Sequence, residues 1–152
     1  MGNPVPSFTK NTDAALATIA FPSSPRGVIT DLPDANSFPL HIWNDKGGGS
    51  AASMQTVKVG VRDVSGTSLD LVITGTALNG YLPMIECRSY GAQGCSDDAQ
   101  SAWTPIGGAT MLDVGDIPAN ARRALYLRMN VPADAPAVNA GQFKPFVDYT
   151  FA

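Results

Sequence analysis

The 152-residue chain has few of the residues that build surface helices. It contains one glutamate, Glu86, and four lysines, whereas the other twelve acidic residues are all aspartate. Glutamate and lysine favour helix interiors, while aspartate favours turns and helix caps. Together with 15 glycines and 12 prolines, this composition predicts strands joined by many turns.

The chain also lacks a membrane segment, a secretion signal and a general positive charge. Its longest apolar run, residues 14–21, is interrupted by Thr18 and is far shorter than the ~20 residues that cross a bilayer. The N-terminus has neither the basic start nor the apolar core of a signal peptide. A net charge of −3 and a pI near 4.8 provide no general attraction to nucleic acid or acidic lipid. We therefore expect synthesis in the cytoplasm and no nucleic-acid or membrane partner.

Residues for metal binding and nucleophilic catalysis are scarce. His41 is the only histidine, and the two cysteines, Cys87 and Cys95, lie far from it in the chain, so a zinc site would lack ligands. His41 is therefore the sole candidate for a catalytic base. It stands between Leu40 and Ile42, so if those two side chains face inward, the His41 side chain is predicted to lie near solvent or an interface. The aspartates fall mainly in predicted turns, where Asp bonds to local backbone. We therefore expect a protein that has no enzymatic activity and binds neither a cofactor nor a metal.

The two cysteines leave a redox question open. Cys87 and Cys95 are close enough in sequence for a loop disulfide, but they can equally remain thiols. Because the chain shows no export signal, reduced thiols are favoured before any release from the cell.

Residues 1–36 differ from the remainder of the chain. They contain five of the twelve prolines and scattered apolar residues without steady alternation. Proline removes a backbone donor and keeps the preceding residue extended, so this segment predicts an extended N-terminal arm rather than sheet core. A short stretch, residues 12–17, is compatible with one helical turn. The apolar residues need a surface to lie on, either the chain's own body or a neighbour; they are Val5, Phe8, Leu16, Ile19 and Phe21.

Residues 37–152 predict a single domain of strands and turns. The clearest strand is residues 54–63, where Val57, Val59 and Val61 share one face. Further strands are expected at residues 40–44, 69–74, 81–87, 111–114, 122–131 and 143–151. Short strands with turn signals every 8–14 residues predict an all-β fold, an antiparallel β-sandwich or jelly roll.

Two surface features offer alternative binding sites. Tyr81, Tyr90, Trp43 and Trp103 could form an aromatic platform for sugar rings, and Tyr90 is the best exposed candidate because glycine and polar residues surround it. A small basic patch could form from Arg122, Arg123 and Arg128. Two or three charges are more typical of the rim of an interface than of a nucleic-acid site.

Five segments of the chain resemble β-sandwich virion proteins of tailed bacteriophages. They are FPLHIWND (38–45), VKVGVRD (57–63), WTPIGG (103–108), VGDIPAN (114–120) and LRMNVPADA (127–135). Within that group, the size and the layout of an arm plus a sandwich look most like capsid decoration (cement) proteins. The resemblance implies a non-enzymatic structural protein on the outer surface of the capsid, bound to the major capsid protein. It also implies a homo-oligomer, with a trimer favoured, and it carries over no catalytic residue.

The arm suggests how such a protein would attach. We expect residues 1–36 to lie across a neighbouring subunit or the major capsid protein, with Phe8, Leu16, Ile19 and Phe21 as anchors. The alternative function is a carbohydrate-binding module of a tail fibre or baseplate that recognises host glycans through Tyr90.

Overall fold

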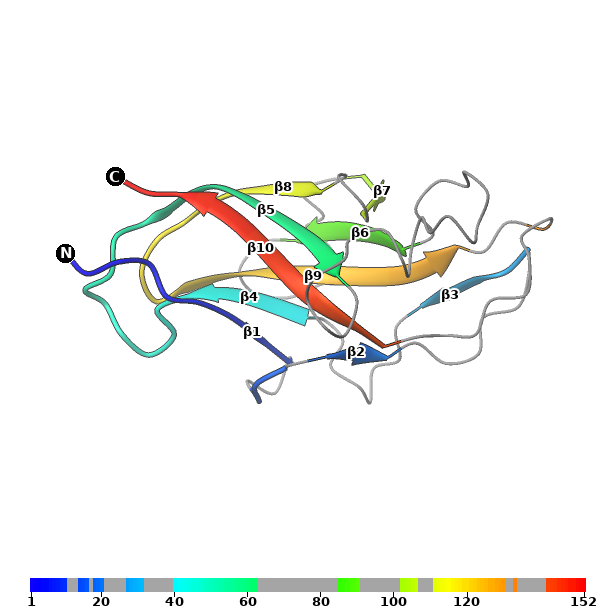
Figure 1. Ribbon diagram of the computed structural model, residues 1–152, viewed down its shortest axis with the longest axis horizontal. Helices are drawn as coiled ribbons and strands as arrows, with labels where there is room; N and C mark the ends of the chain where they lie inside the picture. The colour runs from blue at the N-terminus through cyan, green and yellow to red at the C-terminus, as the bar shows by residue number, and fades with distance from the viewer. Residues whose placement is uncertain are drawn as a thin grey trace.

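The computed structural model is all-β in the part of the chain that it describes, which is residues 1–10, 14–16, 18–20, 27–31, 40–62, 85–90, 102–106, 111–130, 133 and 142–152. These residues form two antiparallel sheets and contain no helix (Figure 1). The expected all-β, antiparallel class is confirmed.

The larger sheet has six strands. Its main path runs β1 (Pro6–Thr9), β4 (Leu40–Asn44), β9 (Ala121–Asn130), β6 (Ile85–Tyr90) and β7 (Thr104–Pro105). A sixth strand, β3 (Ile29–Asp31), pairs with the far end of β9. The long β9 is therefore the centre of this sheet, since it pairs with β4, β3 and β6.

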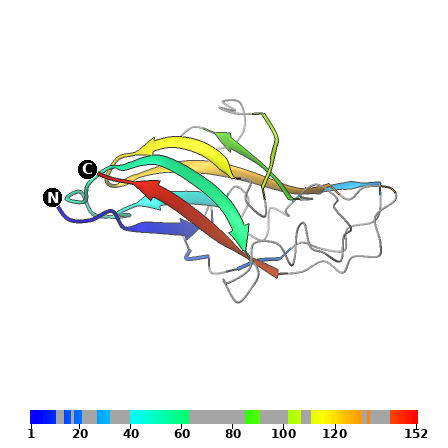
Figure 2. The same ribbon diagram turned by 45° about the horizontal axis from the view of Figure 1, so that its top comes forward.

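The smaller sheet has four strands in the order β2 (Ile19–Ala20), β10 (Gln142–Thr150), β5 (Met54–Arg62) and β8 (Leu112–Ile117). Figure 1 shows β10 crossing the direction of β4 and β9 at an angle. The two termini lie at the same end of the molecule in both views (Figures 1 and 2), one leading into β1 and the other leaving β10.

The two sheets contribute to one hydrophobic core. In β5 the alternation was predicted correctly, because Val57, Val59 and Val61 are buried while Lys58 is exposed. In β9 the buried residues include Leu125, Leu127 and Met129, as their alternation with Arg128 predicts. The core is completed mainly by Leu40, Ile42, Met54, Ile85, Cys87, Ile106, Leu112, Val114 and Ile117.

Asn44 is a fully buried polar residue at the end of β4. Its Nδ2 donates to the carbonyl oxygens of Ala52 and Ile117, both at 2.9 Å, and its Oδ1 accepts the N–H of Val5 at 3.1 Å. Buried polar groups are costly unless paired. This one side chain therefore links the approach to β1, the loop before β5 and the last residue of β8.

The described part of the N-terminal segment belongs to the sheets. β1 pairs with β4, and β2 pairs with β10. Residues 14–16 are also extended: Ala15 forms an antiparallel bridge with Thr9, so the expected helical turn over residues 12–17 is wrong where the structure describes it. Proline explains the position of β1, because Pro6 lacks an N–H and an edge strand tolerates that loss.

Other strands start or end differently from expectation. β6 continues to Tyr90, whereas the sequence predicted that this strand ends at residue 87. β10 ends at Thr150, one residue before the predicted end of this strand, and Phe151 is half exposed. The expected strand at residues 69–74 and the boundary near residue 36 lie outside the described residues.

Candidate interaction surface

The outward face of the six-stranded sheet carries two clusters of aromatic and cationic side chains. Leu125 and Leu127 of β9 point into the core, so the alternating residues Arg122, Tyr126 and Arg128 lie on the opposite face. We refer to this face as the outer face.

The first cluster surrounds Trp43 of β4, which lies opposite Arg122 in the register of β4 and β9. The Arg122 guanidinium carbon is 5.2 Å from the indole centroid, and the Lys46 Nζ is 5.8 Å from it. The indole N–H donates to the hydroxyl of Thr9 at 3.0 Å, which fixes the ring against β1. Cations at these distances are attracted to the negative face of the indole.

The loop that carries Lys46 is held by its neighbours. Asp45 has a left-handed backbone with φ of 51°, and its Oδ2 accepts the N–H groups of Ser50 and Ala51 at 3.3 Å. The N–H of Gly47 donates to the side-chain oxygen of Asn120 at 2.9 Å. These bonds fold the loop back on itself and keep Lys46 close to Trp43.

The second cluster surrounds Trp103, which directly precedes β7. The Arg128 guanidinium lies 4.0 Å from its ring centroid and that of Arg88 lies 6.0 Å away. Tyr126 packs edge-on, with centroids 6.4 Å apart and an interplanar angle of 87°. This arrangement of edge to face is a favourable geometry for aromatic pairs.

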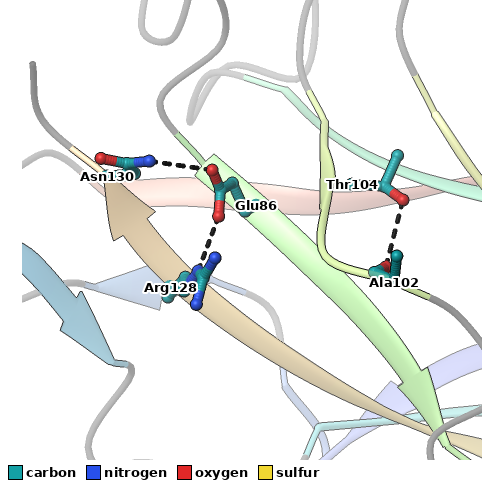
Figure 3. A network of polar contacts seen from close by, with 5 residues as sticks. All are labelled: Glu86, Ala102, Thr104, Arg128 and Asn130. Carbon is teal, nitrogen blue, oxygen red and sulfur yellow. Dashed lines mark hydrogen bonds and ion pairs between the residues drawn. The ribbon is translucent and has the colours of Figure 1, made fainter.

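Glu86 orients Arg128 in the second cluster. Its Oε2 accepts the Arg128 Nε–H at 2.6 Å and its Oε1 accepts the Asn130 Nδ2–H at 3.0 Å (Figure 3). Both carboxylate oxygens are therefore used by β9, and the Arg128 guanidinium is held over Trp103.

The outer face gathers cationic side chains on an acidic protein. Lys46, Arg88, Arg122 and Arg128 lie around the two tryptophan rings, and Glu86 is bonded to Arg128. Asp31 of β3 also lies opposite Arg128 in the register of β3 and β9. The cations around the two rings would attract acidic groups of a partner.

The expected basic patch is split by the structure. Arg122 and Arg128 lie in the two clusters, but Arg123 turns toward β8 and donates to the backbone oxygen of Asp116 at 2.7 Å. His41, expected near solvent or an interface, is only 3% exposed. It sits in the middle of the sheet, with Thr9 of β1 on one side and Ala124 of β9 on the other, both buried.

The apolar residues assigned to the arm mostly serve the chain's own core. Ile19 is 2% exposed and belongs to the core cluster, and Phe8 and Leu16 pack against that cluster. Val5 is 54% exposed and is the one of these residues that the structure leaves at the surface among those it describes. Phe21 lies outside the described residues.

The remaining sequence-predicted residues are placed as follows. Tyr90 is the last residue of β6, in register with Ala124 of β9. Cys87 is a buried free thiol in β6, and desolvation raises its pKa to about 12. Tyr81 and Cys95, the residue that the sequence suggested as a disulfide partner of Cys87, lie outside the described residues.

The chain matches no protein-family model, no curated protein and no solved structure. Within the described ranges, no three His, Cys, Asp or Glu residues come together in a way that could hold a metal ion. Across the same residues, no helix has the length and hydrophobicity needed to span a bilayer.

Proposed function

We propose that this protein is a non-enzymatic structural protein of a tailed-bacteriophage virion, which binds the outer surface of the capsid. The two sheets would form a β-sandwich of the jelly-roll type, and the partner would be the major capsid protein. The sequence resemblance suggests this class, and the cationic, aromatic outer face is the structural observation that supports a protein-binding role.

The composition of the outer face suits contact with another protein. Tryptophan, tyrosine and arginine are the residues that most often dominate binding energy in protein interfaces. Arginine forms charge-assisted, often bidentate hydrogen bonds with carboxylates. We therefore expect Arg122 and Arg128 to meet acidic side chains of the capsid surface.

The N-terminal arm has a smaller role in this proposal than the sequence suggested. Phe8, Leu16 and Ile19 contact the chain's own core, so their use as anchors on a neighbour would require β1 and β2 to leave their sheets. Val5 remains at the surface next to β1 and can still contact a neighbour. The main contact is accordingly assigned to the outer face, with the start of the chain beside it.

Binding can be tested by co-sedimentation. Purified protein is mixed with capsids assembled without it from the major capsid protein encoded in the same genome, and light scattering gives its oligomeric state, with a trimer expected. Arg122→Glu should weaken binding by about tenfold or more, because an attractive charge becomes repulsive in a water-poor interface. Lys144→Glu is the matched control, since it makes the same charge change on β10 of the other sheet and should bind like the parent protein.

The same assay separates this proposal from its alternatives. Rising salt should weaken binding, as expected for a contact between opposite charges. A parent protein that does not bind capsids, or an Arg122→Glu variant that is folded by circular dichroism and binds as tightly as Lys144→Glu, would rule out the proposed docking face.

A further inference from the structure

The four-stranded sheet has a face that points away from the core, and residues of β10, β5 and β8 form rows across it. Val147 of β10 pairs with Val59 of β5, and both contact the core. Successive residues of a strand point to opposite faces, so the residues next to these two valines lie on the other face. We refer to it as the β10–β5–β8 face. Figure 1 shows β10 and β5 side by side along it.

The middle row of this face is apolar. Phe146 of β10 pairs with Gly60 of β5, and Met111, which directly precedes β8, lies over the same glycine. A Cβ atom at position 60 would be only 3.3 Å from the Met111 Cγ, so the glycine leaves room for the methionine side chain. Gly60 is buried, whereas Phe146 and Met111 are only partly buried. An apolar strip that water still reaches therefore crosses the face.

Charged rows of opposite net sign lie on the two sides of the apolar row. On one side, Lys144 of β10 pairs with Arg62 of β5. On the other side, Lys58 of β5 stands between Asp148 of β10 and Asp113 of β8, and these three residues are exposed. The first row thus holds two cationic residues, and the second holds two carboxylates against one ammonium.

A second copy of the chain, turned about a twofold axis at the apolar row, would match this pattern. Lys144 and Asp148 lie two residues before and two residues after Phe146 on the same strand. When two such faces pack antiparallel, Lys144 of each copy meets Asp148 of the other, and every contact occurs twice. Lys58 would then approach Arg62 of the other copy, but the two carboxylates of its own row offset that repulsion.

We propose that the β10–β5–β8 face binds a second copy of this chain, with Phe146 and Met111 at the centre and the two Lys144–Asp148 pairs at the rim. Three strands by five residues cover only about 15 by 17 Å. Such a small contact should be weak and should depend on protein concentration. It does not involve the outer face, so this inference does not depend on the proposed docking to capsids. A twofold contact joins chains in pairs, and it would therefore add to the contacts of the expected trimer.

The test is analytical ultracentrifugation of the full chain from low micromolar to millimolar concentrations. The weight-average mass should at least double over this range, and high salt should suppress the increase. Lys144→Glu should weaken the pairing by about tenfold or more, because it reverses a charge in two symmetric contacts. Lys10→Glu is the matched control, since Lys10 follows β1 in the other sheet and this variant should pair like the parent protein.

A charge exchange between variants tests the arrangement itself. Asp148→Lys should weaken the pairing as Lys144→Glu does, because each variant places like charges opposite each other. An equimolar mixture of the two variants should regain the pairing. In the mixed pair the new carboxylate of one variant meets the new ammonium of the other, and the unchanged Asp148 of the first meets the unchanged Lys144 of the second. At micromolar concentrations, where the pair is dissociated, Lys144→Glu should still bind capsids, so the two contacts can fail separately.

Three outcomes would overturn the inference. They are a mass of the parent protein that stays constant up to millimolar concentration, a Lys144→Glu variant that is folded by circular dichroism and associates as strongly as Lys10→Glu, and a mixture of the two variants that associates no better than either variant alone.

Discussion

Replacing Asn44 with alanine should destabilise the fold far more than the loss of one ordinary surface contact. The change removes three hydrogen bonds and leaves the carbonyls of Ala52 and Ile117, and the N–H of Val5, without their side-chain partner. Each buried polar group that loses its partner costs about 1–3 kcal/mol. We expect a total loss of about 3–5 kcal/mol, a large share of the 5–15 kcal/mol typical of a native protein.

The loss can be measured by urea unfolding followed by tryptophan fluorescence, as a lower midpoint with an unchanged slope. The corresponding fall in melting temperature is roughly 6–20 °C for a chain of this size. Asn130→Ala is the matched control, because Asn130 is only partly buried and its amide donates one side-chain bond, to Glu86; it should cost about 1 kcal/mol. Equal losses for the two variants would refute the assignment of Asn44 as a link between the sheets.

Asn44→Asp extends the same test to pH. The shape is kept, but an ionised carboxylate would face the two carbonyl oxygens that now accept the amide protons. Burial and these oxygens should raise the pKa of the introduced carboxyl above its unfolded value. A raised folded-state pKa means that stability is lost as pH increases through it, so this variant should be closer to the parent protein at about pH 5 than at about pH 8. An opposite trend would contradict the proposed environment.

Two other predictions concern a thiol and a strained residue. The Cys87 thiol, with its pKa raised to about 12 by burial, should resist iodoacetamide at pH 8 in the folded protein and react once urea unfolds it, as mass spectrometry of its peptide will show. Rapid labelling of the folded chain would contradict the burial of Cys87. The free energy of unfolding should also fall as pH rises from about 9, because the thiol ionises in the unfolded state before it does in the folded state. Thr56→Gly should raise stability by about 1 kcal/mol by relieving the left-handed strain, as calorimetry will show. A destabilised Thr56→Gly protein would show that the strain at this position is negligible.

The strand pattern could be predicted from the sequence where one face of a strand is buried and the other exposed. The alternation of Val57, Val59 and Val61 with polar residues, and that of Leu125 and Leu127 in β9, assigned the inward faces correctly. Strand β4 was also found with its observed limits, 40–44. Such patterns are local, so they need no knowledge of the partner strand.

The N-terminal segment shows where this approach fails. Its prolines and irregular spacing predicted an arm outside the sheets, yet Ile19 is a core residue and β1 is an edge strand. Edge and two-residue strands need no long alternation, because they pair through the backbone and bury only one or two side chains each. Those contacts depend on a distant strand, β4 or β10, and leave little trace in the local sequence.

The candidate sites depend on contacts that no local pattern specifies. Trp43 and Arg122 are separated by about half of the chain, and they meet only because β4 pairs with β9 in one register. The sequence identified the arginines and the tryptophans, but it assigned them to separate features. The irregular pairing beside Thr56 was not predicted, because it results from a register shift between β5 and β10.

The shared position of the two termini has a practical consequence. The first residues lead into one sheet and the last leave the other, at the same end of the molecule (Figure 1). Fluorescent dyes attached to the two ends would therefore transfer energy efficiently in the native protein. A drop in that transfer would report the moment at which the sheets come apart, even if each one kept its own backbone pairing.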